Sequence, residues 1–268
     1  MTLRWKPVVS ALLGLGGLLS AGAMLGVGAV PGVAQPAATG HSFFEPFDKV
    51  DERRWYVSDG WSNGNHQGCT WRRNHIGTGK GILYLRLDDK GDAKRPHGCA
   101  ELRTRATLGY GLYEVRMRAA SGSGLNSAMF TYVGPPTYNM HDEIDFEFLG
   151  KAPDAVQLNY YKGGKGGHET VAPSPGAAGD FHVYAFDWSA DGIRWYVDGK
   201  LVRTATGDDI PHTPGQLFLS LWNGSPQVNS WLGAFAYKAP VFAAVDWIAF
   251  TKAGERCAFP QSLRCKTS

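Results

Sequence analysis

The sequence has few charged residues and no run of basic ones. Asp, Glu, Lys and Arg make up 19% of its 268 residues, and the formal net charge is +3. Removing Arg4 and Lys6, which lie near the N-terminus, from the 27 basic side chains leaves 25, against 24 acidic ones. Proteins that bind nucleic acid usually carry a basic patch that follows the phosphate backbone. The absence of any such patch from the sequence therefore predicts no nucleic-acid partner.

Cysteine is also scarce, with only Cys69, Cys99, Cys257 and Cys265. Neither the pair Cys69 and Cys99 nor the pair Cys257 and Cys265 has the spacing of a zinc site, and no neighbouring histidines complete one. Four cysteines instead fit an oxidising compartment. They allow three pairings, of which the simplest joins Cys69 to Cys99 and Cys257 to Cys265. Free buried thiols are the alternative.

Long amphipathic helical patterns, internal repeats and phosphate-binding loops are absent too. The segment KGGKGGHE, at 162–169, contains closely spaced glycines. It has neither the residue order of a P-loop nor a helix pattern after it, which excludes a nucleotide site of that type.

Only one apolar run is long, and it lies at the N-terminus, from Val8 to Val30, after the two basic residues. Small residues near its end resemble a cleavage site after Ala34, and an alternative cut lies after Ala23. The run is long enough to span a bilayer, but it is rich in glycine and no basic stop-transfer cluster follows. We therefore predict a cleaved signal peptide over residues 1–34, a secreted or periplasmic protein, and no stable membrane partner. An uncleaved anchor is the alternative.

Alternation of apolar and polar residues is what the rest of the chain has in abundance. After a flexible segment over 35–42, we predict one domain over 43–268. Strand patterns separated by turn signals recur through it, and Asp198-Gly199 is a strong signal for a two-residue hairpin. Many short strands with frequent turns predict an all-β fold, an antiparallel sandwich of two packed sheets. The clearest strand patterns are ILYLRLDD, GLYEVRMRA, FHVYAFDW, IRWYV, KLVRTA, LFLSLWNG and VDWIAFTK.

The segment HDEIDFEFLG, at 141–150, places an acid at every second position from Glu143. Alternate side chains of a strand share a face, so Glu143, Asp145 and Glu147 project together while the apolar residues between them enter the core. A solvated strand face normally mixes charges, because like charges side by side are unfavourable. No Lys or Arg interrupts this trio. The alternatives are a solvated face, a cation site and a catalytic pair with an assisting acid.

Geometry favours the catalytic pair. Residues four apart on a strand have Cα atoms roughly 13 Å apart. Two Glu side chains leaning together would bring their carboxyl groups to about 5–6 Å, near the separation in a retaining glycosidase. Crowding also separates the proton affinities of neighbouring carboxyl groups. One carboxylate can then attack the anomeric carbon while the other protonates the departing oxygen. Spacing alone does not say which Glu has which role.

The segment DEIDFEFLGK, at 142–151, resembles the active-site strand of family 16 glycoside hydrolases, in the form found in bacterial lichenases (endo-β-1,3-1,4-glucanases). The resemblance runs from about Phe43 to Thr251. It implies a β-jelly-roll with a concave substrate cleft, retention of anomeric configuration and no cofactor required for catalysis. Glu143 would be the nucleophile, Glu147 the general acid/base and Asp145 an assisting carboxylate. Other motifs that carry the resemblance are SFFEPF, SNGN, CTW, GYGLYEVRM, FTYVGP, VQLNYY, GGHE, YAFDW, WYVDG and SLWNG.

The same resemblance implies further site residues. Cys69 and Cys99 stand where these lichenases carry their disulfide. A structural calcium ion on the convex side would use backbone oxygens of Pro46 and Gly81 and the side chain of Asp246. Without the resemblance, a lone Trp such as Trp222 would be assigned to the core, and Glu101 with Arg103 to a surface ion pair of little energetic worth. The implied substrate contacts are Asn63, Glu101, Arg103, Phe130, Tyr132, Gln157, Asn159, Tyr161, Glu169 and Trp222.

Three positions depart from the lichenase pattern. His141 stands in place of Trp, Ser220 in place of Asn, and Trp61 in place of Tyr. His141 is either a surface residue or a substrate contact, and we include it among the predicted contacts. The segments GSGLNSAMFTY and AFTKAGERCAFPQSLRC are similar to the rhizobial branch that cuts succinoglycan-type exopolysaccharides.

We therefore predict a monomeric endo-hydrolase that cuts internal β-1,4 bonds of a polysaccharide, either mixed β-1,3/1,4-linked glucan or a glucan-like exopolysaccharide. Intact carboxylates at all three positions argue against a carbohydrate-binding protein without catalysis. A transglycosylase would use the same intermediate with a sugar acceptor in place of water. Both are kept as alternatives.

Overall fold

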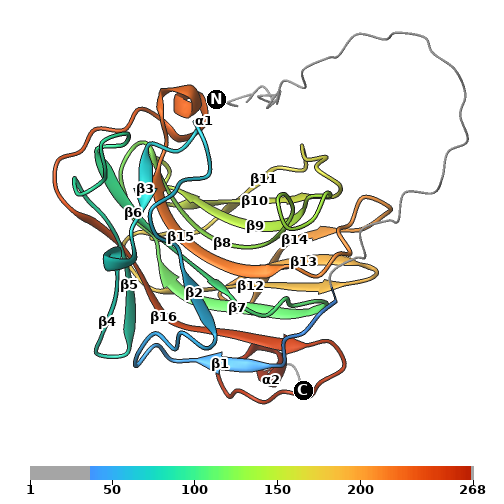
Figure 1. The fold of residues 1–268 in the computed structure, drawn as a ribbon. Helices are drawn as coiled ribbons and strands as arrows, with labels where there is room; N and C mark the ends of the chain where they lie inside the picture. Colours follow the sequence, from blue (N-terminus) through green and yellow to red (C-terminus); the bar gives the residue numbers. More distant parts are fainter. Residues whose placement is uncertain (1–36, 267–268) are drawn as a thin grey trace, which may run out of the picture.

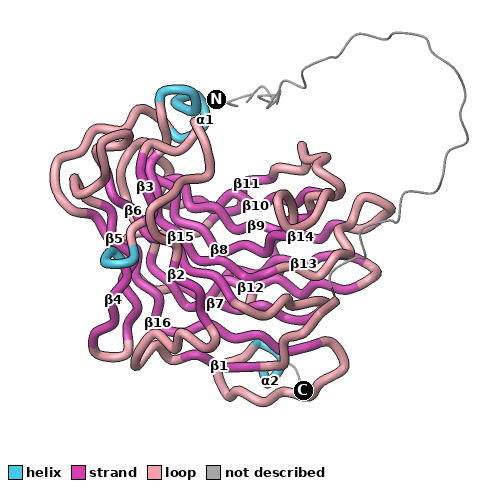
Figure 2. The backbone as a smooth tube through the Cα atoms, viewed as in Figure 1, coloured by secondary structure: helices cyan, strands magenta, loops and turns pink. Residues whose placement is uncertain are grey.

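The computed structural model describes residues 37–266, which form two β-sheets packed face to face (Figures 1 and 2). The predicted signal peptide lies outside the described residues, together with the first two residues of the predicted flexible segment. Within the described part, no helix is long and apolar enough to cross a membrane. The predicted all-β sandwich is confirmed.

One sheet, here called the back sheet, has eight strands, all antiparallel to their neighbours. Strand β1 (Phe43–Glu45) pairs with β16 beside the main path of the sheet. The strands of that path, in spatial order, are β14 (Lys200–Ala205), β13 (Gly192–Val197), β12 (His182–Ser189), β7 (Gly111–Arg118), β16 (Val241–Lys252), β5 (Ile82–Leu87) and β4 (Ile76–Gly79).

The other sheet, here called the site sheet, also has eight strands, and they bend along their length (Figure 1). Strand β3 (Cys69–Trp71) lies off the main path and is parallel to its partner β6. The strands of the main path, in spatial order, are β11 (Thr170–Pro173), β10 (Ala155–Tyr161), β9 (Asp142–Leu149), β8 (Leu125–Val133), β15 (Gln216–Asn223), β6 (His97–Thr104) and β2 (Trp55–Val57).

Helices in the described residues are short, as expected from a sequence without long helical patterns. Each has three or four residues, and all lie in connections between strands or after the last strand. They are η1 (Arg73–His75), η2 (Pro226–Val228), α1 (Asn229–Leu232) and α2 (Leu263–Lys266).

The predicted hairpin at Asp198-Gly199 joins β13 to β14. Both residues have positive φ, 49° and 80°, as required by the tight turn whose twist matches that of the flanking strands. Glycine adopts this conformation without the steric cost that other residues pay. The clearest strand patterns in the sequence are thus confirmed, together with the turn between two of them.

The core lies between the sheets, and β9 contributes one of its faces. Ile144, Phe146 and Phe148 are at most 2% exposed. The ring of Phe146 packs against Tyr184 and Phe186 of β12 in the back sheet, with ring centroids 5.6 and 6.3 Å apart. Because alternate side chains point to opposite faces, this packing directs the acids of β9 to the outer face of the site sheet.

Candidate active site

The three acids lie on a regular strand near the middle of the site sheet. Strand β9 pairs with β8 and β10 without a register shift. The residues beside each acid therefore share its face. Tyr132 and Tyr161 flank Glu143, Phe130 and Asn159 flank Asp145, and Ala128 and Gln157 flank Glu147.

The same rows continue across β15 and β6. Phe218 and Arg103 extend the row of Asp145, and Ser220 and Glu101 extend the row of Glu147. The structure thus brings eight residues with a predicted site role onto one face with the trio. They are Glu101, Arg103, Phe130, Tyr132, Gln157, Asn159, Tyr161 and, just before β9, His141. This face is called the carboxylate face below.

The surroundings of the middle acid favour its protonated form. Burial raises the pKa of Asp145 well above its usual range, and the charges of Glu143 and Glu147 raise it further. Asp145 is hydrogen-bonded to Glu143. A protonated carboxyl group donates such a bond and an ionised one accepts it, so Asp145 supports Glu143 as a carboxylate.

Glu147 is protonated over much of the pH range. Burial, followed by the charge of Glu143, raises the pKa of Glu147 to about 8, while a hydrogen bond from Asn126 acts in the opposite direction. The Asn126 amide nitrogen lies 3.1 Å from Glu147 Oε1. A carboxyl group with such a pKa keeps its proton at neutral pH and can give it to a leaving oxygen. The environments of Glu143 and Glu147 thus differ in the sense required by an acid and a nucleophile.

The fourth acid of the segment, Asp142, has a different task. Its carboxylate accepts backbone N–H bonds from Gly163 at 2.8 Å, His212 at 3.2 Å and Thr213 at 3.1 Å. Burial opposes ionisation, but these donors keep the pKa of Asp142 below its usual range. Asp142 therefore fixes two loops beside the start of β9. Its position outside the alternating trio gave no sequence signal for this role.

Glu101 is buried, so it does not form the surface ion pair that the sequence alone suggests. It is 1% exposed, and Ser58 Oγ donates a 2.6 Å hydrogen bond to it. Burial raises the pKa of Glu101 to about 7, against the lowering effects of Ser58, Arg103 and Asn63. The Arg103 guanidinium lies over the ring of Tyr56, 4.8 Å from its centroid. Both side chains are thus held at defined positions on the carboxylate face.

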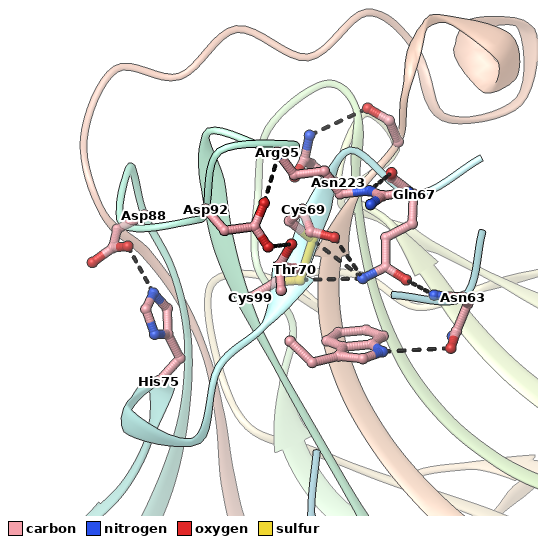
Figure 3. The surroundings of a disulfide bond; sticks show 12 residues. Asn63, Gln67, Cys69, Thr70, His75, Asp88, Asp92, Arg95, Cys99 and Asn223 are labelled. Atoms are coloured by element: carbon pink, nitrogen blue, oxygen red, sulfur yellow. Dashed lines mark hydrogen bonds and ion pairs between the residues drawn. A yellow bond between two sulfur atoms is a disulfide. The ribbon is translucent and has the colours of Figure 1, made fainter. Parts of the chain in front are cut away.

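Asn63 reaches this region on a loop fixed by the disulfide between Cys69 and Cys99 (Figure 3). Its backbone N–H donates to Gln67 Oε1 at 2.9 Å, and Gln67 Nε2 donates to the Cys69 carbonyl. A side-chain hydrogen bond joins Asn63 to Glu101. Both predicted disulfides, Cys69–Cys99 and Cys257–Cys265, are confirmed.

Trp222 begins an aromatic cluster at one end of the carboxylate face, in the row beyond Glu147. Its ring lies 5.6 Å from His66 and 6.0 Å from Trp231. The indole N–H of Trp231 donates to Gln157 Oε1 at 2.8 Å. His66 and Trp231 escaped sequence reasoning because both lie outside strand patterns. The only local signal is Ser225, whose hydroxyl caps η2 just before α1.

Glu169 lies in the exposed segment before β11 and is itself exposed. Burial is the main cause of the raised pKa of Asp145, Glu147 and Tyr161, and the charge of Glu169 adds a smaller contribution to each, so Glu169 lies near the trio. Ser220, which stands where the lichenase pattern has Asn, is small and buried. Its Oγ has no hydrogen-bond partner among the described residues, and neither has the side-chain oxygen of Asn159. Trp61 packs edge-on against Trp71, with ring centroids 6.5 Å apart.

The residues of the predicted calcium site belong to the back sheet or its connections: Pro46 follows β1, Gly81 joins β4 to β5, and Asp246 lies in β16. A Cβ built on Gly81 would lie 3.9 Å from both the Pro46 carbonyl oxygen and Asp48 Oδ1, so Gly81 lies close to the predicted Pro46 ligand. The carboxylate of Asp246 is paired with Arg116, at 2.5 Å. An Asp246 carboxylate that binds calcium would have to exchange this cationic partner for the ion. Calcium stays a prediction, and the chemistry below does not depend on it.

Comparisons with known proteins match most of the chain. The model of the family "Glycosyl hydrolases family 16" matches residues 63–248. The endo-1,3-1,4-beta-glycanase ExoK of Rhizobium meliloti is 48% identical over 227 residues, which cover 84% of each chain. A beta-glucanase of Bacillus subtilis is 46% identical over 218 residues, 81% of this chain and 88% of its own. The solved beta-glucanase of Bacillus licheniformis has a TM-score of 0.76 at 44% identity, covering 80% of this chain and 99% of its own.

Proposed function

This chain belongs to glycoside hydrolase family 16, and on that premise we propose that it is a retaining endo-hydrolase of a β-linked polysaccharide. It would cut internal β-1,4 bonds in mixed β-1,3/1,4-linked glucan or in a glucan-like exopolysaccharide. The observation that carries the proposal is the trio Glu143, Asp145 and Glu147 on one face of an unshifted strand. The names of the relatives in Rhizobium meliloti and Bacillus subtilis support this substrate class.

In the first step, Glu143 attacks the anomeric carbon and the bond from that carbon to the glycosidic oxygen breaks. Glu147 gives its proton to the departing oxygen, so the leaving chain departs with a neutral hydroxyl group. Asp145 supports the charge of Glu143 before attack through its hydrogen bond. The product of this step is a glycosyl ester on Glu143 and an ionised Glu147.

In the second step, Glu147 takes a proton from water while the water oxygen attacks the same anomeric carbon. The ester bond breaks and Glu143 leaves as a carboxylate. Two inversions restore the original configuration. Glu147 regains its proton, which its raised pKa favours, so the site returns to its starting state without any other reactant.

The rest of the carboxylate face suits a sugar chain. Aromatic rings offer apolar platforms for sugar faces, and buried polar groups next to them orient hydroxyl groups. Phe130 and Phe218 are stacked 4.7 Å apart. Trp222 with Trp231 offers a second aromatic surface.

The direct test replaces Glu143 with Gln, which keeps the side-chain shape but removes the nucleophile. We expect a loss of hydrolysis of roughly a thousandfold or more, because the glycosyl ester cannot form. Release of reducing ends from lichenan and from a succinoglycan-type polymer measures the effect, and NMR of the first product tests retention. The matched control is Glu52→Gln, at an exposed ion pair with Arg73. Near-normal turnover by Glu143→Gln would remove Glu143 from the mechanism.

We also propose that the protein is exported and acts as a monomer. The N-terminal pattern described above and two disulfides support export, because disulfides persist in oxidising compartments.

A further inference from the structure

The imidazole of His141 contacts the proposed nucleophile directly. Nε2 of His141 is hydrogen-bonded to Oε2 of Glu143. The ring is stacked on Tyr161, with centroids 4.8 Å apart and planes 17° apart. It also packs against Tyr132 at 5.1 Å. These two tyrosines flank Glu143 on the neighbouring strands, so His141 lies over Glu143 between them.

The backbone of His141 is held as firmly as its ring. Its carbonyl oxygen accepts a 2.7 Å hydrogen bond from the N–H of Gly164. The next residue is Asp142, whose carboxylate accepts three backbone N–H bonds from two loops. The position of the ring is therefore set by the fold rather than by a flexible side chain at the surface.

From these contacts we propose that His141 is a positioning residue that orients the Glu143 carboxylate for attack. The inference rests on the proposed function of Glu143. For Glu143 to accept the bond, the imidazole must carry a proton on Nε2. A hydrogen bond donated to a carboxylate favours its charged form and limits its rotation. Asp145 supplies a second donor, so Glu143 is held by one donor two residues before it and another two residues after it.

The packing of the ring distinguishes this role from that of a sugar platform. A ring that stacks on a sugar needs an open face. One face of His141 is stacked on Tyr161, the ring also contacts Tyr132, and the side chain is only 28% exposed. The contact with Glu143 uses the ring edge, which is the part that can donate a hydrogen bond.

Each strand next to this imidazole places one titratable group against it. These groups are Glu143 on β9, Tyr132 on β8 and Tyr161 on β10. The pKa of both tyrosines is raised, in each case by burial first and then by nearby carboxylates, so both are neutral at working pH. In the loop after β10, the Lys162 ammonium donates to the Asp208 carbonyl and Lys165 is exposed. Glu143 is therefore the charged group to which the imidazole is hydrogen-bonded, while Glu169, before β11, lies close enough to add to the raised pKa of Tyr161 after burial and the carboxyl groups of β9.

Two substitutions separate positioning from substrate contact. His141→Phe keeps a ring between the tyrosines but removes the donor, whereas His141→Gln places an amide N–H near the position of Nε2. We expect His141→Phe to lower kcat about ten- to a hundredfold, the usual range for a lost bond to a charged group, with KM changed less than about threefold. We expect His141→Gln to recover most of kcat.

Opposite results would overturn the proposal. A rise in KM with unchanged kcat, equal in both variants, would make His141 a substrate contact. Melting temperatures of both variants show whether the fold is intact.

A measurement independent of activity tests the contact itself: the ¹⁵N NMR signals of the His141 ring in the wild type and in Glu143→Gln. We expect the wild type to show the Nε2-protonated form and the variant to differ from it. Identical signals would overturn the proposal even in an active enzyme. A wild type that releases no reducing ends would instead reject the proposed function, while the NMR result still decides whether His141 binds Glu143.

Discussion

At the scale of single residues, the environment assigns roles that spacing leaves open. Glu143 and Glu147 are equivalent in the alternating pattern of the sequence. In the folded chain, Glu143 has donors on two sides, from His141 and Asp145. At Glu147, burial and the charge of Glu143 both oppose ionisation of the carboxyl group. The proposed roles, nucleophile at one position and acid at the other, thus follow from the different groups around each carboxyl group.

The raised pKa of Glu147 predicts a cost in stability at alkaline pH. An unfolded Glu loses its proton near pH 4.5, but folded Glu147 keeps it up to about pH 8. Between these values the folded state binds more protons, so stability falls as pH rises, by on the order of a few kcal/mol. Glu147→Gln cannot ionise. We expect it to raise the melting temperature at pH 8 and to leave it unchanged at pH 4, where the wild-type side chain is also neutral.

The same variant is expected to lose hydrolysis by about 10²–10⁴-fold, the usual contribution of a general acid. Scanning calorimetry at pH 4, 6 and 8 measures the first effect and reducing-end release the second. A melting temperature that falls at pH 8 on substitution would contradict the raised pKa. An increase with normal activity would confirm the electrostatics but remove Glu147 from catalysis.

At the scale of elements, β9 depends on its first residue for its place beside two loops. Asp142 begins the strand and ties the loop after β10 and the segment before β15 to it. The carbonyl of His141 is bonded to the first of these loops. The proposed nucleophile, Glu143, is therefore positioned by a strand whose start is fixed on both sides, and the sheet register fixes the rest.

Asp142→Asn tests this anchor. An amide oxygen still accepts hydrogen bonds but without the charge, so we expect a loss of about 1–3 kcal/mol in the free energy of unfolding. We also expect kcat to fall, because His141 would be held less firmly. Urea unfolding and kinetics on lichenan measure the two effects. The matched control is Asp191→Asn in the exposed turn between β12 and β13. Equal stability of the two variants would show that the Asp142 carboxylate is not an anchor.

At the scale of the whole molecule, one disulfide belongs to the site and the other to the tail. Cys69–Cys99 joins β3 to β6 and supports the loop that carries Asn63 (Figure 3). Cys257–Cys265 closes a short loop near the C-terminus, where the N–H of Leu263 donates to Glu114 of the back sheet. The two disulfides therefore differ in loop length and in the part of the fold that each one supports.

Removing each disulfide by double substitution with Ser separates these roles. The loops span 30 and 8 residues. Chain entropy then predicts losses of about 3–4 and about 2–3 kcal/mol in the free energy of unfolding. We expect KM to rise only in the Cys69/Cys99 variant, since Asn63 and Glu101 lie next to that crosslink. Urea unfolding with kinetics on each variant checks this, and a KM change confined to the Cys257/Cys265 variant would contradict it.

The sequence by itself determined the fold class, the main strands and the face on which the acids lie, and it favoured, among three pairings, the two disulfides that the structure has. Each of these features depends on the alternation of apolar and polar residues, on a turn dipeptide or on a short motif, all of which can be recognised in the sequence. The resemblance extended this to residues such as Phe130 and Tyr161, which the sheet register indeed places beside the trio.

Only the tertiary structure decided what surrounds each of these groups. Glu101 is buried by residues that its local sequence does not reveal. Residues far apart in sequence also meet in the ion pair of Asp246 with Arg116, in the three N–H bonds to Asp142 and in the hydrogen bond from Trp231 to Gln157. The contact of His141 with Glu143 joins near neighbours, but the direction of the ring is set by tyrosines on two other strands. Proton affinity and orientation depend on such through-space neighbours, and no local pattern encodes them.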